Sequence, residues 1–381
     1  MTLFAIIAGL LIIVTVLLDA FETVVLPRRI QRSLRLTSWF YRRTWTPWAS
    51  LSRHFNSVNR REAFLSYFGP LSLIVLLMVW AGALILGFAL LQYGAGKQIS
   101  LANHPVTFGG LLYHSGETFF TLGYGDILPT SPLARTLAVS EAGMGFAFLA
   151  VVIGYLPVVY SSFSSREHEI SLLDSRAGSP PAASELLKRL GCCPDQSVLD
   201  FIFRDWERWS SEVLESHLSY PVLPYYRSQH SNQSWLGALT LMLDVTTLII
   251  VGVDGLRPDQ AKLTFAMARH AAVDLAQVLS ARYDPHYADR LPPPELQHLR
   301  SLLAENGMTL RQDPEANRKL NELRLLYEPY VNALATKLSI TLPPWIRNFD
   351  KKDNWQAGPW DRAVQARNLE GIGTPLVRDH F

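Results

Sequence analysis

The chain has 381 residues, of which 49% are apolar, and its mean hydropathy is positive. This length suffices for two or three domains, and this composition is typical of a protein that is partly embedded in a membrane. Lysine and arginine together number 35 and aspartate and glutamate 33, so the net charge of +2 is too small to predict nucleic-acid binding. The two cysteines, Cys192 and Cys193, are adjacent. Adjacent cysteines rarely form a structural disulfide, which indicates a reduced, cytosolic setting and leaves a redox or metal role as the alternative.

Residues 1–27 predict a first membrane helix, because positions 3–18 are almost wholly apolar. The basic residues Arg28 and Arg29 follow the apolar run, whereas a secretory signal would carry its basic charge in front. We therefore expect a retained transmembrane helix whose N-terminus lies outside the cell.

Two carboxylates, Asp19 and Glu22, lie one turn apart near the inner end of this helix. Carboxylates at that depth are costly unless they are paired or near headgroup water, which leaves a functional contact open. Otherwise we expect them to reach the interface or to meet arginines of the following segment.

Residues 28–65 predict a basic and aromatic cytoplasmic linker at the membrane interface. Arginines and aromatic residues are interleaved over 28–61, a pattern that suits anionic lipids, because the rings lie at headgroup level and the guanidiniums meet phosphates. A voltage sensor would need arginines at every third position inside a membrane-length helix, and these lie outside one. The aromatic residues of this segment are Trp39, Phe40, Tyr41, Trp45 and Trp48.

The next segments predict an outer helix and a short re-entrant helix. Residues 66–92 are long enough to cross about 30 Å of hydrocarbon. Residues 94–106 contain glycine, asparagine and proline and indicate an extracellular loop. The apolar run at 107–120 is too short to span, and non-helical backbone beyond it is tolerable at membrane depth only when buried in protein or lining water.

Residues 121–126 read Thr-Leu-Gly-Tyr-Gly-Asp and predict an ion filter. A line of backbone carbonyls and one threonine hydroxyl can replace the water around a dehydrated potassium ion. Glycine at alternate positions permits the backbone angles that point successive carbonyls along one narrow path. By itself Gly-Tyr-Gly-Asp would be an ordinary turn, but the membrane-length segments on both sides favour the filter. The candidate ion-binding residues are Thr121, Leu122, Gly123, Tyr124 and Gly125.

Residues 66–163 resemble the pore domain of the potassium channel family, whose filter reads Thr-Val/Ile-Gly-Tyr-Gly-Asp. Leu122 departs from the usual β-branched residue, at a position whose side chain points away from the ion path. The resemblance implies an all-α membrane protein with a two-helix pore loop and four identical subunits around one axis. It also implies potassium as the permeant ion, held by filter carbonyls, and no cofactor.

Glu117 lies one turn before Thr121, where the family has an aliphatic residue or, in some bacterial members, glutamate. There it is expected to meet Asp126 behind the filter, and two carboxylates in a desolvated site would share a proton. We expect this pair to support the filter and to set acid-sensitive inactivation. The alternative is a structural hydrogen bond without consequence for gating. His114, a turn earlier, is expected to pack behind the filter.

Residues 133–163 predict the inner helix. Distance from Asp126 aligns Gly145 with the family's hinge glycine, and Pro157 removes a helical hydrogen bond and favours a bend near the cytoplasmic mouth. For Pro157 plain packing is the alternative to a role in the gate. Glu141 is a functional candidate as an ionisable group inside a membrane helix, and whether it faces the ion path or the outer helix stays open.

The remaining chain predicts a linker at 164–181, a cytoplasmic all-α domain at 182–342 and a poorly ordered tail at 343–381. Helical periodicity covers 182–190, 195–218, 232–253, 258–282, 293–305 and 314–340. The stretch 235–253 is nearly long and apolar enough to span a membrane, but Asp244 lies in its middle. A buried helix of the bundle is therefore favoured, and a fourth crossing, which would put the tail outside, is the alternative.

Together these features predict a multi-pass cell-membrane channel that conducts potassium passively and is gated through the inner helix and the filter. Its cytoplasmic domain would regulate gating or assembly, with an unknown ligand. No nucleophile, metal set or phosphate loop favours an enzyme, and His270 with Asp274 are too few for a metal site. A potassium-uptake subunit would need several pore repeats in one chain, where we find one. The second alternative is a non-conducting membrane sensor that keeps the pore as a scaffold.

Overall fold

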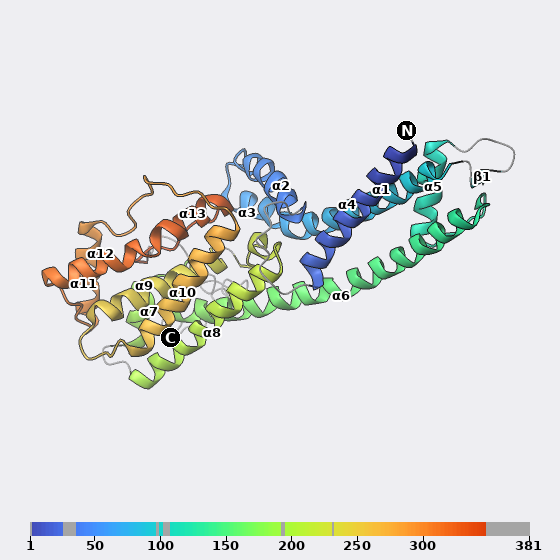
Figure 1. The fold of residues 1–381 in the computed structure, drawn as a ribbon. Helices are drawn as coiled ribbons and strands as arrows, with labels where there is room; N and C mark the ends of the chain where they lie inside the picture. Colours follow the sequence, from blue (N-terminus) through green and yellow to red (C-terminus); the bar gives the residue numbers. More distant parts are fainter. Residues whose placement is uncertain are drawn as a thin grey trace, which may run out of the picture. The chain divides into compact units, whose positions relative to one another are not determined.

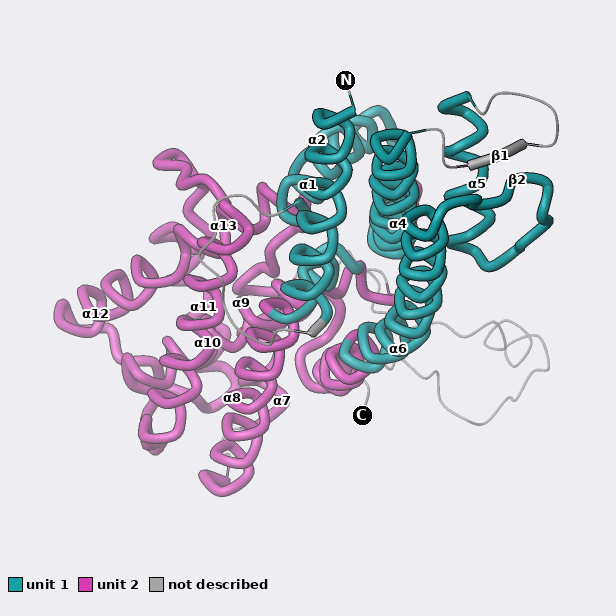
Figure 2. Tube along the Cα trace, turned by 45° about the vertical axis from the view of Figure 1, so that its right-hand side comes forward, with its two compact units in different colours: residues 1–56, 63–162, 219–226 teal, residues 57–62, 163–218, 227–381 magenta. Residues whose placement is uncertain are grey.

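The computed structural model describes residues 2–25, 36–96, 99–101, 107–191, 195–230 and 232–347. Cys192 and Cys193, the arginines at 28–35, most of the expected extracellular loop and residues 348–381 of the expected tail lie outside this part of the chain. What is described is all-α apart from one two-stranded ribbon (Figure 1). The chain divides into two compact units, coloured in Figure 2, namely unit 1 with residues 1–56, 63–162 and 219–226, and unit 2 with residues 57–62, 163–218 and 227–381.

Unit 1 holds the membrane-length helices that precede and follow the candidate filter. Its elements are α1 (Thr2–Ala20), the π-helix η1 (Phe21–Val25), α2 (Leu36–Ser52), α4 (Phe68–Gly94), β1 (Ile99–Leu101), α5 (Phe108–Phe119), β2 (Ile127–Pro129), the first part of α6 (Pro132–Ala177) and the 3₁₀ turn η2 (Leu223–Tyr225). Helix α3 (Val58–Ser66) has residues in both units. By length and composition, four stretches of the described chain can cross a membrane: Thr2–Val24, Val58–Gly94, Pro132–Ala177 and Trp235–Gly252.

Helix α1 packs closely along α4 through glycines. A Cβ atom added to Gly9 would lie 2.7 Å from the carbonyl oxygen of Gly87, and one added to Gly87 would lie 2.7 Å from Cγ1 of Ile13. In a lipid environment, helices associate mainly by close packing, and small residues let their backbones approach. The first helix is therefore an integral part of the unit that holds the candidate filter.

Asp19 connects three helices of unit 1. Its carboxylate is buried and accepts hydrogen bonds from the Thr37 amide at 3.2 Å, from the Thr37 hydroxyl at 2.6 Å and from the Trp80 indole at 3.1 Å. These partners lie on α2 and α4, and all three donors are neutral. The sequence had instead suggested headgroup water or arginine as the partners of this carboxylate. The buried carboxylate thus joins α1, α2 and α4 at one point.

The segment expected as an interfacial linker folds into α2 and α3, and several of its aromatic rings turn inward. Phe40, Tyr41 and Trp45 share one face of α2 and are buried, whereas Trp39 is exposed. The Trp45 ring lies 4.9 Å from that of Phe68 in an edge-to-face arrangement. The expectation of rings at headgroup level is therefore wrong for the three buried residues, because their helical spacing places them on one apolar face.

The inner helix is longer than expected. Helix α6 continues through Ala177, although the sequence predicts its end at Phe163 and a linker at 164–181. Its last turns carry apolar residues at helical spacing, and Ile170, Leu173 and Ala177 are buried within unit 2. This packing keeps the segment helical where polarity alone indicated a linker.

Unit 2 is a helical bundle around α9. Its elements are the end of α6, α7 (Ala183–Leu190), α8 (Gln196–Ser219), α9 (Trp235–Gly252), α10 (Asp259–Val278), α11 (Pro293–Glu305), α12 (Pro314–Leu325) and α13 (Glu328–Leu338). The predicted helix 314–340 is two helices, because Pro329 lies in the first turn of α13, where its missing N–H is tolerated. Protein buries 94% of the apolar window of α9, which needs no lipid to cover it.

Asp244 in the middle of α9 is completely buried and paired. The Arg290 guanidinium contacts both carboxylate oxygens, and the Tyr327 hydroxyl donates to one of them at 2.6 Å. Arg290 also lies 3.7 Å from Glu328. Burial alone would lower the pKa of the Arg290 guanidinium, but the carboxylates of Asp244 and Glu328 raise it above its usual value. The polar residue in the middle of this apolar helix is thus the centre of a buried ionic network.

We expect Asp244→Ala to destabilise unit 2 by about 3–5 kcal/mol, because removing one partner of a buried ion pair leaves the other charge uncompensated. Hydrogen exchange of α9 amides in the purified full chain measures this loss of protection. Glu322→Ala is the matched control, since Glu322 forms an exposed pair with Arg318 at 3.7 Å and should leave exchange unchanged. Unaltered protection of α9 in the Asp244 variant would contradict the role given to this network.

Candidate functional site

Helix α5 is fixed at both of its ends. It begins with Thr107, whose hydroxyl oxygen accepts a hydrogen bond from the Gly110 amide at 3.2 Å. It ends in a Schellman motif, in which the Leu122 amide donates to the Glu117 carbonyl at 2.7 Å and the Thr121 amide donates to the Thr118 carbonyl at 3.1 Å. The candidate filter therefore starts from a defined helix end.

The backbone of the candidate filter takes left-handed angles at alternate residues. The φ angles are 56° at Thr121, 62° at Gly123 and 78° at Gly125. Glycine takes such angles without steric cost, which accounts for its presence at two of the three positions. Thr121 is β-branched, and a positive φ is a genuine outlier for such residues. This conformation costs about 1–3 kcal/mol, which the contacts of the surrounding structure must offset. The strain thus lies where the helix passes into the filter.

Residues 121–126 are all exposed in the single chain. The side chains of Leu122 and Tyr124 are 56% and 69% exposed. The segment therefore lies at the surface of the single chain.

The segment after the filter is anchored to its own helices. The Asp126 carboxylate accepts a hydrogen bond from the Ile127 amide at 3.1 Å. Ile127 packs with Leu111 of α5 and Ala134 of α6 in a buried cluster. Strand β2 also pairs with β1 in antiparallel register, with Leu101 opposite Ile127. Both ends of the filter segment are thereby attached to α5 and α6.

Gly145 allows α6 to touch the end of α5. A Cβ atom added to Gly145 would lie 1.9 Å from the Phe119 carbonyl oxygen, too close for any side chain. The rings of Phe119 and Phe148 lie 5.8 Å apart beside this contact. The hinge role expected for Gly145 stays a prediction, and the observed geometry gives this glycine a packing role. Pro157, the second expected gating residue, is exposed and lies inside α6, and its gate role also stays a prediction.

Glu117 pairs with His114 in the single chain. Nδ1 of His114 lies 3.1 Å from Oε1 of Glu117, and both side chains are buried. Asp126, the expected partner of Glu117, instead bonds its neighbouring backbone amide. Among the described residues Glu117 thus has His114 as its hydrogen-bond partner, at i to i+3 spacing on α5, and its expected pairing with Asp126 stays a prediction.

Glu141 faces α5, which answers a question that the sequence left open. Its carboxyl group contacts the Ser115 hydroxyl, and Glu141 is 0% exposed. The same hydroxyl lies 2.7 Å from the Ile85 carbonyl oxygen of α4. Ser115 was missed by sequence reasoning, although a small polar residue inside a short apolar helix is a signal of helix contact. These three residues connect α4, α5 and α6 behind the filter segment.

We expect Gly145→Ala to displace the end of α5, because the added methyl group would collide with backbone that cannot move independently. Overpacking of this kind costs about 1–3 kcal/mol. The measurement is faster hydrogen exchange of the amides at 118–123 in the purified protein. Gly143→Ala is the control, since a Cβ at Gly143 would meet nothing within 4 Å. Equal exchange in both variants would contradict the packing role.

Comparisons with known proteins bear on the same region. Residues 74–161 match the family model described as "Ion channel". The chain is 23% identical over 239 residues to the "Uncharacterized membrane protein YdjJ" of Bacillus subtilis, which covers 62% of this chain and 68% of that protein. It is 29% identical over 93 residues to "Protein LctB" of Geobacillus stearothermophilus, which covers 20% of this chain and 64% of that protein. No solved structure was found to match.

The matched residues include most of α4, all of α5, the filter segment and the first part of α6. Helices α4 and α6 are each long and apolar enough to cross a membrane. The chain is therefore an all-α membrane protein, and its residues 74–161 match the ion channel family model, as is expected of a pore-loop channel domain.

Proposed function

We propose that the protein is a potassium-selective channel that conducts K⁺ passively across the cell membrane as a homotetramer. The observation that carries this proposal is the backbone of residues 121–125, with positive φ at Thr121, Gly123 and Gly125 directly after the short helix α5. Carbonyls at matched spacing replace the hydration shell of potassium, and the Thr121 hydroxyl adds one oxygen. Selectivity of this kind needs no charged side chain in the ion path.

The exposure of the filter segment supports assembly. Irregular backbone at membrane depth must be covered by protein or line a water-filled path. Four copies around one axis would meet both needs, because the filter carbonyls would face the axis and neighbouring subunits would cover Leu122 and Tyr124. The C-terminal ends of the four α5 helices would then direct their partial negative charge toward the path and favour a cation there.

The charge distribution supports an orientation with unit 2 in the cytoplasm and the N-terminus outside. Basic residues cluster at 28–61, directly after the first membrane helix, which is the side that the positive-inside rule assigns to the cytoplasm. Arg42 and Arg43 of α2 are exposed and would meet anionic lipid headgroups. Gating would act through α6 and the filter, with unit 2 in a regulatory role.

Ion flux from proteoliposomes that contain the purified full chain tests the proposal. We expect K⁺ flux far above Na⁺ flux in the unmodified protein. Gly123→Ala should lower the ratio of K⁺ flux to Na⁺ flux at least about tenfold, because a Cβ in the left-handed conformation costs about 1–2 kcal/mol in each subunit.

Gly116→Ala is the matched control. Both glycines have open space around them in the single chain, but only Gly123 has a positive φ. The control should therefore keep selective flux, which separates conformation from the added volume. Potassium-selective flux that survives Gly123→Ala would exclude the filter assignment. The absence of any flux in the unmodified protein would favour a non-conducting sensor.

A further inference from the structure

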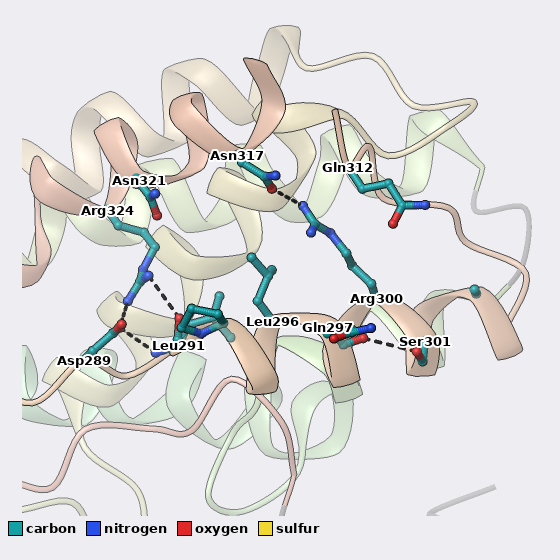
Figure 3. A pocket seen from close by; sticks show the side chains of 12 residues that line it. Asp289, Leu291, Leu296, Gln297, Arg300, Ser301, Gln312, Asn317, Asn321 and Arg324 are labelled. Atoms are coloured by element: carbon teal, nitrogen blue, oxygen red, sulfur yellow. Dashed lines mark hydrogen bonds and ion pairs between the residues drawn. The ribbon is translucent and has the colours of Figure 1, made fainter. Parts of the chain in front are cut away.

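Unit 2 contains a polar pocket between α11 and α12, drawn in Figure 3, with a volume of about 730 Å³. This volume lies in the range of small-molecule sites. Arg324 and Asp289 lie at one end of the lining, and Arg300 lies beside Asn317 and Gln312 (Figure 3). Amide side chains thus line much of the space between two arginines.

The two arginines of the pocket differ in their partners. Arg324 contacts the carboxylate of Asp289 and bonds that of Glu328 at 3.1 Å. Burial alone would lower the pKa of the Arg324 guanidinium, but these carboxylates raise it above its usual value. Arg300 donates only to neutral oxygens in the described structure, those of the Asn317 side chain at 2.5 Å and the Arg311 carbonyl at 3.2 Å.

Arg300 is half-buried, and its Nε atom is buried without a hydrogen-bond partner among the described residues. Burial lowers its pKa, with no carboxylate to oppose the effect. A half-buried cation without a counter-charge loses part of its hydration, and an anion in the pocket would compensate for that loss. The planar guanidinium group suits a carboxylate or a phosphate, both of which accept paired hydrogen bonds.

We propose that this pocket binds a small polar ligand through an anionic group, a carboxylate or a phosphate, that pairs with Arg300. Amide groups of Gln312, Asn317 and Asn321 would bond the remainder of the ligand. Asp289 is engaged by Arg324 and the Leu291 amide, so the ligand's anionic group is directed to the Arg300 side of the pocket. This site lies within unit 2 and does not depend on ion conduction.

Hydrogen exchange of the purified full chain, titrated with sodium phosphate or with sodium acetate, tests the proposal. Sodium chloride at matched ionic strength is the reference. We expect saturable slowing of exchange over α11 and α12 with at least one of the two probes. A response to phosphate alone indicates a phosphorylated ligand, and a response to acetate alone indicates a carboxylic acid. No saturable response to either probe would overturn the proposal.

Arg300→Gln should weaken this response at least about tenfold, as loss of a charge-assisted hydrogen bond does. Arg318→Gln is the control on α12, since Arg318 is 72% exposed and does not line the pocket. Normal hydrogen exchange of α9 in Arg300→Gln would show that unit 2 is folded. Arg300→Lys, which keeps the charge, should bind the responding anion more tightly than Arg300→Gln does. An equal response of Arg300→Gln and the unmodified protein would overturn the proposal.

A second inference rests on the hydroxyl group of Ser115. Its oxygen contacts the Ile85 carbonyl oxygen and the carboxyl group of Glu141, but a hydroxyl has only one hydrogen to donate. The Ile85 carbonyl can only accept. Both contacts are therefore separate, two-centre hydrogen bonds only if Glu141 donates to Ser115, which requires a proton on its carboxyl group.

The surroundings of Glu141 agree with a neutral acid. Its second oxygen is buried without a hydrogen-bond partner among the described residues. Helix α4 contains no acidic or basic residue, and on α5 His114 and Glu117 are paired with each other. On α6 itself, Arg135 bonds the Pro129 carbonyl. An ionised carboxylate at this place would lack a counter-charge inside a membrane-length helix.

We infer that Glu141 is a protonated, positioning residue that donates to Ser115 and holds α6 to α5 and α4. The inference that Glu141 is protonated is independent of the proposed channel function. The inference that Glu141 supports a selective filter rests on that proposed function. Infrared difference spectra between the unmodified protein and Glu141→Gln should show the carbonyl band of a protonated carboxyl group. Carboxylate bands in its place would overturn the assignment, whether or not the protein conducts.

The positioning role has its own test in proteoliposomes. Glu141→Gln keeps a neutral donor and should retain selective K⁺ flux, while Glu141→Val and Ser115→Ala should each lower selectivity several-fold. Ser140→Ala is the control, because Ser140 is exposed on the neighbouring position of α6. Loss of selectivity in Glu141→Gln equal to that in Glu141→Val would contradict the donor role.

Discussion

The structure of unit 1 depends on one constraint, that a short irregular segment beside membrane-length helices must be held by its neighbours. The Schellman motif at the end of α5 fixes the first residues of the filter, and Ile127 fixes the segment that follows it. Gly145 brings α6 against the Phe119 carbonyl, so the inner helix supports the same point from behind. Without a rigid support, a loop of this kind would have no reason to keep left-handed angles at alternate residues.

Much of this region could be predicted from the sequence, because its signals are local. The filter motif, the short helix before it and the membrane-length helices on both sides each depend on a few adjacent residues, and the family match covers them. Residues that act through tertiary contacts were harder to predict. Sequence spacing suggested Asp126 as a partner of Glu117 but did not predict the contact with His114 that the fold shows. Gly145 suggested flexibility, and only the three-dimensional structure shows that its missing side chain permits a backbone contact.

Unit 2 illustrates how composition alone leaves two answers open. Helix α9 has the length and hydropathy of a membrane span, yet surrounding helices bury nearly all of it. The distinction rests on Asp244, whose partners Arg290 and Tyr327 are 46 and 83 residues away in the sequence. No local pattern reports such pairings, since they arise from the packing of α9 against later segments. The same limit applies to Arg300, which differs from Arg324 only in what the fold places beside it.

Thr121 combines two properties that oppose each other. As the residue after the end of α5, it occupies a position where glycine would be the relaxed choice, and it adopts a φ of 56° with a branched side chain. Glycine there would remove the strain but would also remove the Thr121 hydroxyl, which the proposed filter would use as an ion ligand. In the proposed filter, Thr121 would thus supply an extra ligand atom at the cost of a strained backbone conformation.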